Sequence, residues 1–240
     1  MPAFAHDRQP DRHATGLAWF ASPAGQGVLA TEAAAVARVL SGCPALPWAW
    51  LGVSSALPPP GGRRSVLLRR EGRELAGSVR CRLPLPLASE TFGAVLLQHV
   101  LDEGRDQAAL LEECARVLAP GGTLWLATLN PWSPYRARWA GRGLHARGPG
   151  RWQRMLRRAG FAGGSIRLQW LGPHWHASPG EAGVAVMDRF RASIAITVSK
   201  RAPAMVPPTP LRQLRWQAGR WPVDEVRRAC GGDLQQRTRR

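Results

Sequence analysis

The pattern of apolar and polar positions predicts strands and helices that follow one another with short connections. Short apolar or alternating runs predict strands over residues 48–53, 65–68, 78–83, 92–97, 123–129, 165–171 and 192–199. Apolar residues at helical spacing predict helices over residues 17–40, 106–118 and 151–159. The Ser22-Pro23 step predicts a break in the first of these helices.

Strands that alternate with helices over short connections predict an α/β fold. We expect a mostly parallel sheet of the seven-stranded type, covered by helices on both faces. The proline- and glycine-rich run Pro58–Gly62 predicts a loop between the first two strands in place of the usual crossover helix. The first half of the fold is therefore expected to be reduced.

The length of 240 residues is enough for one ordinary domain with tails. Residues 1–15 are polar and predict a flexible arm, residues 16–200 carry the periodic elements, and residues 201–240 predict a basic tail rich in proline and arginine. With 45% apolar residues and no repeat, the chain is neither collagen-like nor a coiled coil.

The distribution of charge and of apolar residues bears on location and partners. The formal net charge is +17, and residues 131–170 contain nine arginines and no acidic residue. A positive surface of this kind attracts polyanions, so nucleic acid is a candidate partner through residues 131–170. No apolar stretch is long enough to span a membrane, and residues 1–16 lack the apolar core of a signal peptide, which predicts a cytoplasmic protein.

Metal-ligand patterns are weak in this sequence. The four cysteines are far apart and have no paired spacing for zinc or redox chemistry. His174-Trp175-His176 has two histidines but no third ligand nearby. We therefore predict no metal site.

Two runs in the middle of the chain carry a resemblance to a known family. Leu83–Leu101 contains Leu-Pro-Leu-Pro, a strand and Gln-His-Val-Leu, and Leu111–Leu124 ends its helix on Arg-Val-Leu-Ala-Pro-Gly-Gly. Their order resembles the second half of the class I S-adenosylmethionine-dependent methyltransferases of the type 11 group. The Asn130-Pro131-Trp132-Ser133 segment after the next strand resembles the ending of one bacterial subgroup.

The resemblance implies a Rossmann-like methyltransferase fold, S-adenosylmethionine as cofactor and a methyl acceptor that the sequence leaves unidentified. It implies a cofactor site at the carboxyl ends of the strands. The candidate cofactor-binding residues are Gly52, Ser54, Ser55, Gln98 and His99. The candidate acceptor-binding residues are Asn130 and Trp132, and His99 is also a candidate general base because its ordinary pKa lies near neutrality.

The first half of the chain departs from the family at the positions that hold the cofactor. The turn after the first strand has one glycine, Gly52, in place of several, and the second strand ends in Arg69-Arg70 in place of an acid. Arg82 stands where the family has an acid that faces the adenine. Gly93 stands where the family has the aspartate of a Phe-Asp pair. The sequence therefore predicts a degenerate first half.

Two alternatives to a methyltransferase remain open at this stage. The missing glycines and acids favour a methyltransferase-fold protein that serves as a scaffold or partner without catalysis. The acid-free, aromatic-containing span of residues 131–170 favours a basic nucleic-acid-binding module. Each candidate residue also has a structural interpretation: His99 as a hydrogen-bonded strand end, Asn130 as a cap, and the tryptophans as inward-packing rings.

Overall fold

The computed structural model describes residues 16–43, 45–60, 64–173 and 186–201, all of which belong to the compact unit Met1–Pro203. The strands are β1 Trp48–Val53, β2 Ser65–Glu71, β3 Glu74–Gly77, β4 Phe92–Gln98, β5 Leu118–Leu129, β6 Arg167–Leu171 and β7 Ser193–Ser199. The α-helices are α1 Pro23–Ser41, α2 Gln107–Val117 and α3 Pro149–Arg158. Short 3-10 helices are η1 Gly16–Ala21, η2 Pro134–Arg138, η3 Gly163–Ser165 and η4 Val186–Phe190.

The seven strands form one sheet in the order β3-β2-β1-β4-β5-β7-β6. The central pairs β1–β2, β1–β4 and β4–β5 are parallel, and the pairs nearer the edges, β2–β3, β5–β7 and β6–β7, are antiparallel. The predicted seven-stranded α/β fold is confirmed, with a parallel centre and antiparallel edges. The chain leaves β1 toward one edge and β4 toward the other, so the strand order reverses between them.

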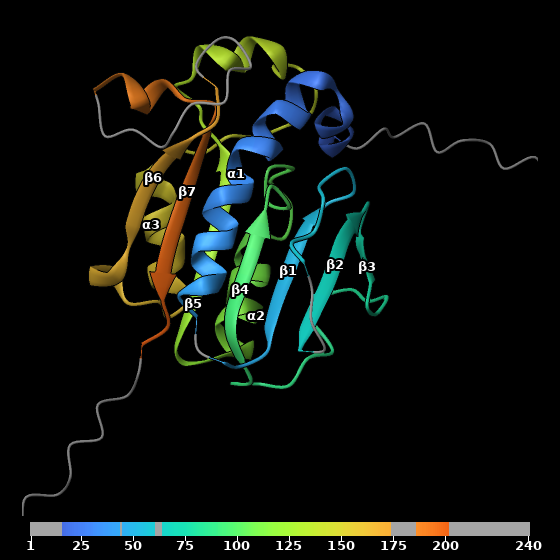
Figure 1. The fold of residues 1–240 in the computed structure, drawn as a ribbon, viewed down its shortest axis with the longest axis vertical. Helices are drawn as coiled ribbons and strands as arrows, with labels where there is room; N and C mark the ends of the chain where they lie inside the picture. The colour runs from blue at the N-terminus through green and yellow to red at the C-terminus, as the bar shows by residue number, and fades with distance from the viewer. Residues whose placement is uncertain (1–15, 44, 61–63, 174–185, 202–240) are drawn as a thin grey trace, which may run out of the picture. The chain divides into compact units, whose positions relative to one another are not determined.

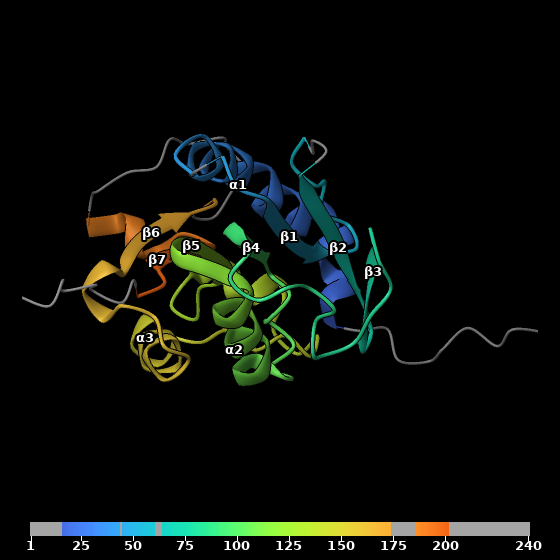
Figure 2. The same cartoon turned by 90° about the horizontal axis from the view of Figure 1, so that it is seen from below.

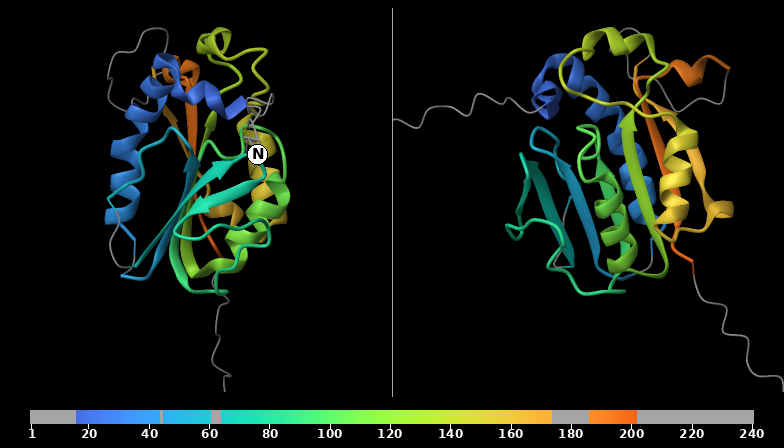
Figure 3. Two further views of the ribbon diagram at one scale, coloured as in Figure 1. Left: turned by 90° about the vertical axis from the view of Figure 1, so that its right-hand side faces the viewer. Right: turned by 180° about the vertical axis from the view of Figure 1, so that it is seen from behind.

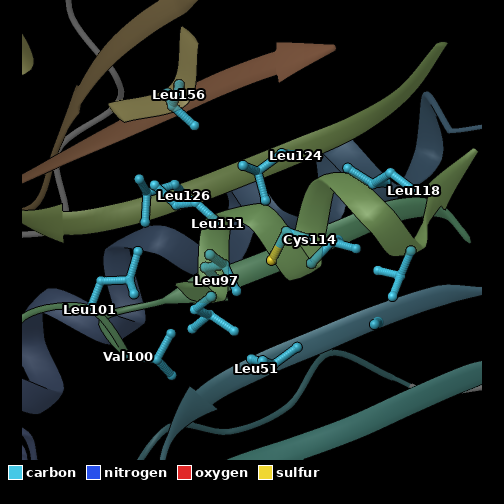
Figure 4. Packing of buried hydrophobic residues seen from close by; sticks show 14 of the residues in the cluster. Leu51, Leu97, Val100, Leu101, Leu111, Cys114, Leu118, Leu124, Leu126 and Leu156 are labelled. Atoms are coloured by element: carbon cyan, nitrogen blue, oxygen red, sulfur yellow. The ribbon is translucent and has the colours of Figure 1, made fainter. Parts of the chain in front are cut away.

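Helices cover both faces of the sheet, α1 on one side and α2 and α3 on the other (Figures 1, 2 and 3). The face toward α2 packs one apolar cluster, which includes Leu51, Leu97 and Leu126 from the strands with Leu111 and Cys114 from α2 (Figure 4). The face toward α1 packs a second cluster. The strands therefore have nearly continuous apolar sequences because both of their faces are buried.

The face toward α1 is covered by fewer helices than the other. No helix connects β1 to β2 among the described residues, so α1 is the one described α-helix on this face, beside the short helices η1 and η2. The predicted break lies between η1 and α1, where Ser22 caps α1 by accepting a hydrogen bond from the Gly25 N–H at 3.2 Å. We therefore expect contacts other than apolar packing to help hold α1 on the sheet.

The prediction of a strand over Ser78–Leu83 is wrong. The chain turns at Gly72, whose φ of 59° is in the left-handed region, and returns at once as the antiparallel strand β3. Of the predicted segment, Cys81 makes an isolated bridge to Leu75. Among the described residues, no helix thus follows β1 or β2 before the chain reaches β4.

The segment before β4 is fixed to α2 by polar contacts. The Arg116 guanidinium donates to the carbonyls of Leu85 and Leu87 at 2.9 Å, and the Glu113 carboxylate accepts from the Leu85 N–H at 2.7 Å. Arg116 and Glu113 also pair at 2.8 Å, and the hydrogen bond from Arg116 lowers the pKa of Glu113. These contacts position β4 relative to α2.

The described residues include little of the predicted arm and tail. Residues 1–15 and 202–240 lie outside the described part, so the predicted domain boundaries stay predictions. Within the described ranges, none of the helices combines the length and the apolar character that a membrane span needs.

Gly52 is predicted to be required for packing within β1. A Cβ atom at Gly52 would lie 2.0 Å from the indole of Trp50, which is fully buried on the same face of the strand. We expect Gly52→Ala to force the indole to move and to lower the free energy of unfolding by about 1–3 kcal/mol. Urea unfolding measures the loss, and near-UV circular dichroism reports the displaced indole.

Gly164→Ala is the matched control, because a Cβ atom there meets nothing within 4 Å. Equal stability of the two variants would contradict the proposed role of Gly52.

Candidate functional site

The carboxyl ends of β1 and β4 form the point where the strand order reverses. Gly52 of β1 pairs directly with Gln98 of β4, so two of the predicted site residues lie side by side. Open α/β sheets bind ligands outside the carboxyl ends of their strands at such a point. A ligand-binding site is therefore expected at this edge of the sheet.

Gln98 and His99 are buried at this edge in a hydrogen-bond network that reaches α1. The Trp50 indole N–H donates to Gln98 Oε1 at 3.1 Å, and Gln98 Nε2 donates to Glu32 Oε2 of α1 at 2.9 Å. His99 Nε2 lies 2.9 Å from Glu32 Oε1, and His99 Nδ1 lies 2.7 Å from Asp102 Oδ2. Glu32, His99 and Asp102 are all 0% exposed.

The Asp102 carboxylate extends the network to the neighbouring strand. Its Oδ1 accepts from the Thr128 hydroxyl, and its Oδ2 accepts from the Leu129 N–H at 3.1 Å. Sequence reasoning did not identify Glu32 or Asp102. The available signal was the position of Glu32 between Val28 and Val36 on the buried stripe of α1.

The state of His99 follows from these neighbours. Burial by itself lowers the pKa of His99, but the charges and hydrogen bonds of Glu32 and Asp102 outweigh it and raise the pKa to about 10. His99 is therefore protonated at neutral pH and donates from both ring nitrogens. Phe20 of η1 covers the imidazole, with ring centroids 4.4 Å apart. A buried imidazolium cannot accept a proton, so the candidate general base does not fit that role.

The turn after β1 contains the remaining predicted cofactor residues. The Ser54 hydroxyl donates to the carbonyl of Arg70 at 2.7 Å and joins the ends of β1 and β2. The Ser55 hydroxyl is buried and makes no hydrogen bond with the residues that the structure describes. Gln26 of α1 donates to the Ser55 carbonyl at 3.1 Å. The Ser55 hydroxyl thus lies buried in the turn, next to the carbonyl that Gln26 binds.

A cavity of about 270 Å³ lies between α1 and the Leu57–Pro60 segment. Its walls are mainly apolar side chains of α1, such as Leu29 and Ala33, and Gln26 and Gln98 provide its polar groups. The Leu57–Pro60 segment stands where a fold of this kind places the crossover helix after β1. The cavity is consequently a result of the reduced first half.

The end of β2 has the opposite charge from the one that the resemblance implies. Arg70 is buried there, and the adjacent Glu71 is exposed and lies 3.5 Å from Arg80. A ribose diol needs an acceptor such as a carboxylate, which an arginine cannot supply. The residues at the end of β2 therefore do not fit the ribose of S-adenosylmethionine, whereas Gln26 and Gln98 provide polar groups at the wall of the neighbouring cavity.

Asn130 and Trp132 follow β5 and differ in accessibility. Asn130 Nδ2 donates to the carbonyls of Arg189 and Arg191 at 2.7 Å, and Asn130 Oδ1 accepts from the Trp132 N–H at 3.0 Å. Asn130 is fully buried, so its amide fixes the loop in the described conformation. The Trp132 side chain is 54% exposed and remains a candidate contact for an acceptor.

The aromatic side chains of the basic segment point mostly inward. Tyr135, Trp139 and Trp152 are buried, whereas stacking on nucleic-acid bases needs exposed rings. Contact with nucleic acid through residues 131–170 stays a prediction on charge alone. His174 and His176 lie outside the described residues.

Comparison with known proteins gives one family match, to the methyltransferase domain over residues 68–126. An uncharacterised protein of Mycobacterium tuberculosis is 36% identical over 142 residues, which cover 52% of this chain and 48% of that protein. The ubiquinone biosynthesis O-methyltransferase of Parvibaculum lavamentivorans is 44% identical over 46 residues, covering 19% of this chain and 18% of that protein. The chain spans about half the length of the longer curated match.

Among solved structures, an S-adenosylmethionine-dependent methyltransferase from Thermotoga maritima superposes with a TM-score of 0.51 at 18% identity. The superposition covers 77% of this chain and 94% of that structure. A likeness at this identity concerns the fold. Residues 68–126 therefore match the methyltransferase domain model, and the chain has the Rossmann-like fold of the S-adenosylmethionine-dependent methyltransferases.

Proposed function

We propose that this chain is an S-adenosylmethionine-dependent methyltransferase. The observation that carries the proposal is the family match over residues 68–126, which runs from β2 through most of β5 and includes the strand β4 at the reversal point. When bound, the cofactor supplies a methyl group that is already activated on a sulfonium, so the protein needs no covalent nucleophile. The acceptor stays unidentified.

The residues proposed to hold the methionine end of the cofactor are Gln26 and Gln98, the polar residues that line the cavity. A methionine end carries an ammonium and a carboxylate, which need both acceptors and donors. The side-chain amides of Gln26 and Gln98 contain both kinds of group, an N–H donor and an oxygen acceptor. These groups supply polar contacts at one end of a mainly apolar cavity.

His99 is proposed as a positioning residue. Its two N–H groups bind Glu32 of α1 and Asp102 after β4, and so it fixes the helix that lines the cavity. Any proton that leaves the acceptor must go to water or to a group outside this network, because His99 already holds its proton.

A methyltransferase-fold partner protein without catalysis is the second candidate. The observation that favours it is the set of buried side chains at the β4 end, where Phe20, Trp50 and His99 occupy the space next to the reversal point. The two candidates differ in one property, which is affinity for the cofactor.

Calorimetric titration with S-adenosylmethionine and S-adenosylhomocysteine tests the proposal. We expect both ligands to bind the wild type, and Ala30→Phe to weaken binding by about tenfold or more because Ala30 lines the cavity next to Gln26. Ala34→Phe is the matched control, because Ala34 is an exposed alanine of α1 that does not line the cavity. Absence of heat from either ligand with folded wild type would reject the proposal and favour the partner protein.

The buried imidazolium predicts a pH dependence of stability. The pKa of His99 is raised from 6.5 to about 10, so its contribution is fully present below pH 6.5 and is lost as the pH rises toward 10. We expect the free energy of unfolding of the wild type to fall with a limiting slope of about 1.4 kcal/mol per pH unit in this window. Urea unfolding at several pH values measures the slope.

His99→Asn removes the titrating group while an asparagine tolerates the left-handed backbone, since φ at His99 is 59°. We expect the variant to have a flatter profile than the wild type. His145→Asn is the control, because His145 is exposed. Parallel profiles for the wild type and His99→Asn would show that His99 is not the titrating group.

A further inference from the structure

A second cleft lies beside the β2–β3 hairpin, at the carboxyl end of β2. Its volume is about 720 Å³, within the range of small-molecule sites. Four arginines line it: Arg70, Arg73, Arg82 and Arg105. The only acidic side chain that lines it is Asp106, among the residues that the structure describes. The cleft therefore carries a net positive charge.

The four arginines differ in how far they are already paired. Arg82 donates to Glu74 Oε1 at 2.8 Å, so it is largely neutralised. Arg70 has a side chain only 4% exposed, which donates to the Gly72 carbonyl at 2.8 Å and lies 3.7 Å from Asp106. Arg73 and Arg105 are exposed and form no ion pair within the described ranges. The guanidiniums of Arg73 and Arg105 are thus free to bind a ligand, and the guanidinium of Arg70 is buried beside them.

The start of α2 adds backbone donors to the same cleft. Asp106 precedes the helix in a left-handed conformation, with φ of 50°, and its side chain does not cap the helix. The first turn of α2 contains no acidic residue, and Ala109 of this turn lines the cleft. The N-terminus of a helix favours negative charge through its free N–H groups, so it reinforces the arginines.

We propose that this cleft binds a small molecule through a phosphate or diphosphate group. Guanidinium groups present paired donors that match phosphate oxygens, and they attract a dianion more strongly than a monoanion. A sulfonium cation is repelled by the same charges. The inference goes beyond the proposed methyl transfer and does not depend on it.

A nucleic acid fits the cleft less well than a small molecule. Proteins that bind single strands combine a basic groove with exposed aromatic rings on which bases stack. The apolar residues that line this cleft are Leu75, Leu83 and Ala109, and none of them is aromatic. The convergent arginines therefore favour a single anionic group over an extended backbone.

Calorimetric titration with pyrophosphate and with ADP, at low salt, tests the proposal on the full chain. We expect both probes to bind the wild type and the double variant Arg73→Ala/Arg105→Ala to bind them about tenfold more weakly or worse. Arg70 is left unchanged because it is buried. The control Arg38→Ala/Arg158→Ala removes two exposed arginines outside the cleft and is expected to change affinity by less than about twofold.

Three outcomes would overturn the proposal. One is the absence of pyrophosphate and ADP binding by folded wild type. Another is an equal loss in both double variants, which would mean that the overall charge attracts the probe. The third is that a single-stranded oligonucleotide displaces ADP and that the Arg73→Ala/Arg105→Ala variant weakens its binding as much as it weakens the binding of ADP. S-adenosylmethionine titrated into the same variants separates failure of this proposal from failure of methyl transfer.

Discussion

The hydrogen-bonded set Glu32, His99 and Asp102 is the interaction on which the arrangement of this domain depends. One face of the sheet has α1 as its one described α-helix, because no helix joins β1 and β2 among the described residues. The hydrophobic effect that packs this helix on the sheet is non-directional. Charged hydrogen bonds between buried groups are directional, and here they tie α1 to β4 and, through Thr128, to β5. The same hydrogen bonds lie at the carboxyl end of β4, beside the point where the strand order reverses.

The motif that resembles the methyltransferase family has a structural role in this chain. Its helix residues Glu113 and Arg116 hold the segment around Leu85, and this contact sets the start of β4. Its His99 sits between two carboxylates and not in open solvent. The part of the chain that resembles the family therefore contains the contacts that build β4, α2 and β5. The departures from the family lie at the residues where the resemblance implies contact with a ligand. Such a division explains how a strong fold signal coexists with an altered cofactor edge.

Most elements could be predicted because a strand that is buried on both faces has a nearly continuous apolar sequence. Strands such as β1 and β4 are short apolar runs, and three consecutive prolines predict the loop after β1. The β2–β3 hairpin was missed because it depends on the turn at Gly72, and alternation beyond it suggested a strand that does not form. The site was less predictable than the fold. Gly52 and Gln98, two of the candidate residues, pair with each other across β1 and β4. In contrast, nothing in the sequence indicates that Glu32 of α1 has His99 as its partner.

Charge at the end of β2 determines which ligands this edge can accept. A carboxylate there accepts hydrogen bonds from a diol and tolerates a nearby cation, whereas Arg70 can only donate and repels a cation. Burial of Arg70 makes the difference stronger, because a low dielectric increases the interaction of a charge with its neighbours. The arginine at this position therefore provides donors for an anion where a carboxylate would provide acceptors for a diol. The Arg70 guanidinium is held by the Gly72 carbonyl and by Asp106 at the start of α2, so the altered charge is built into the hairpin and the helix together.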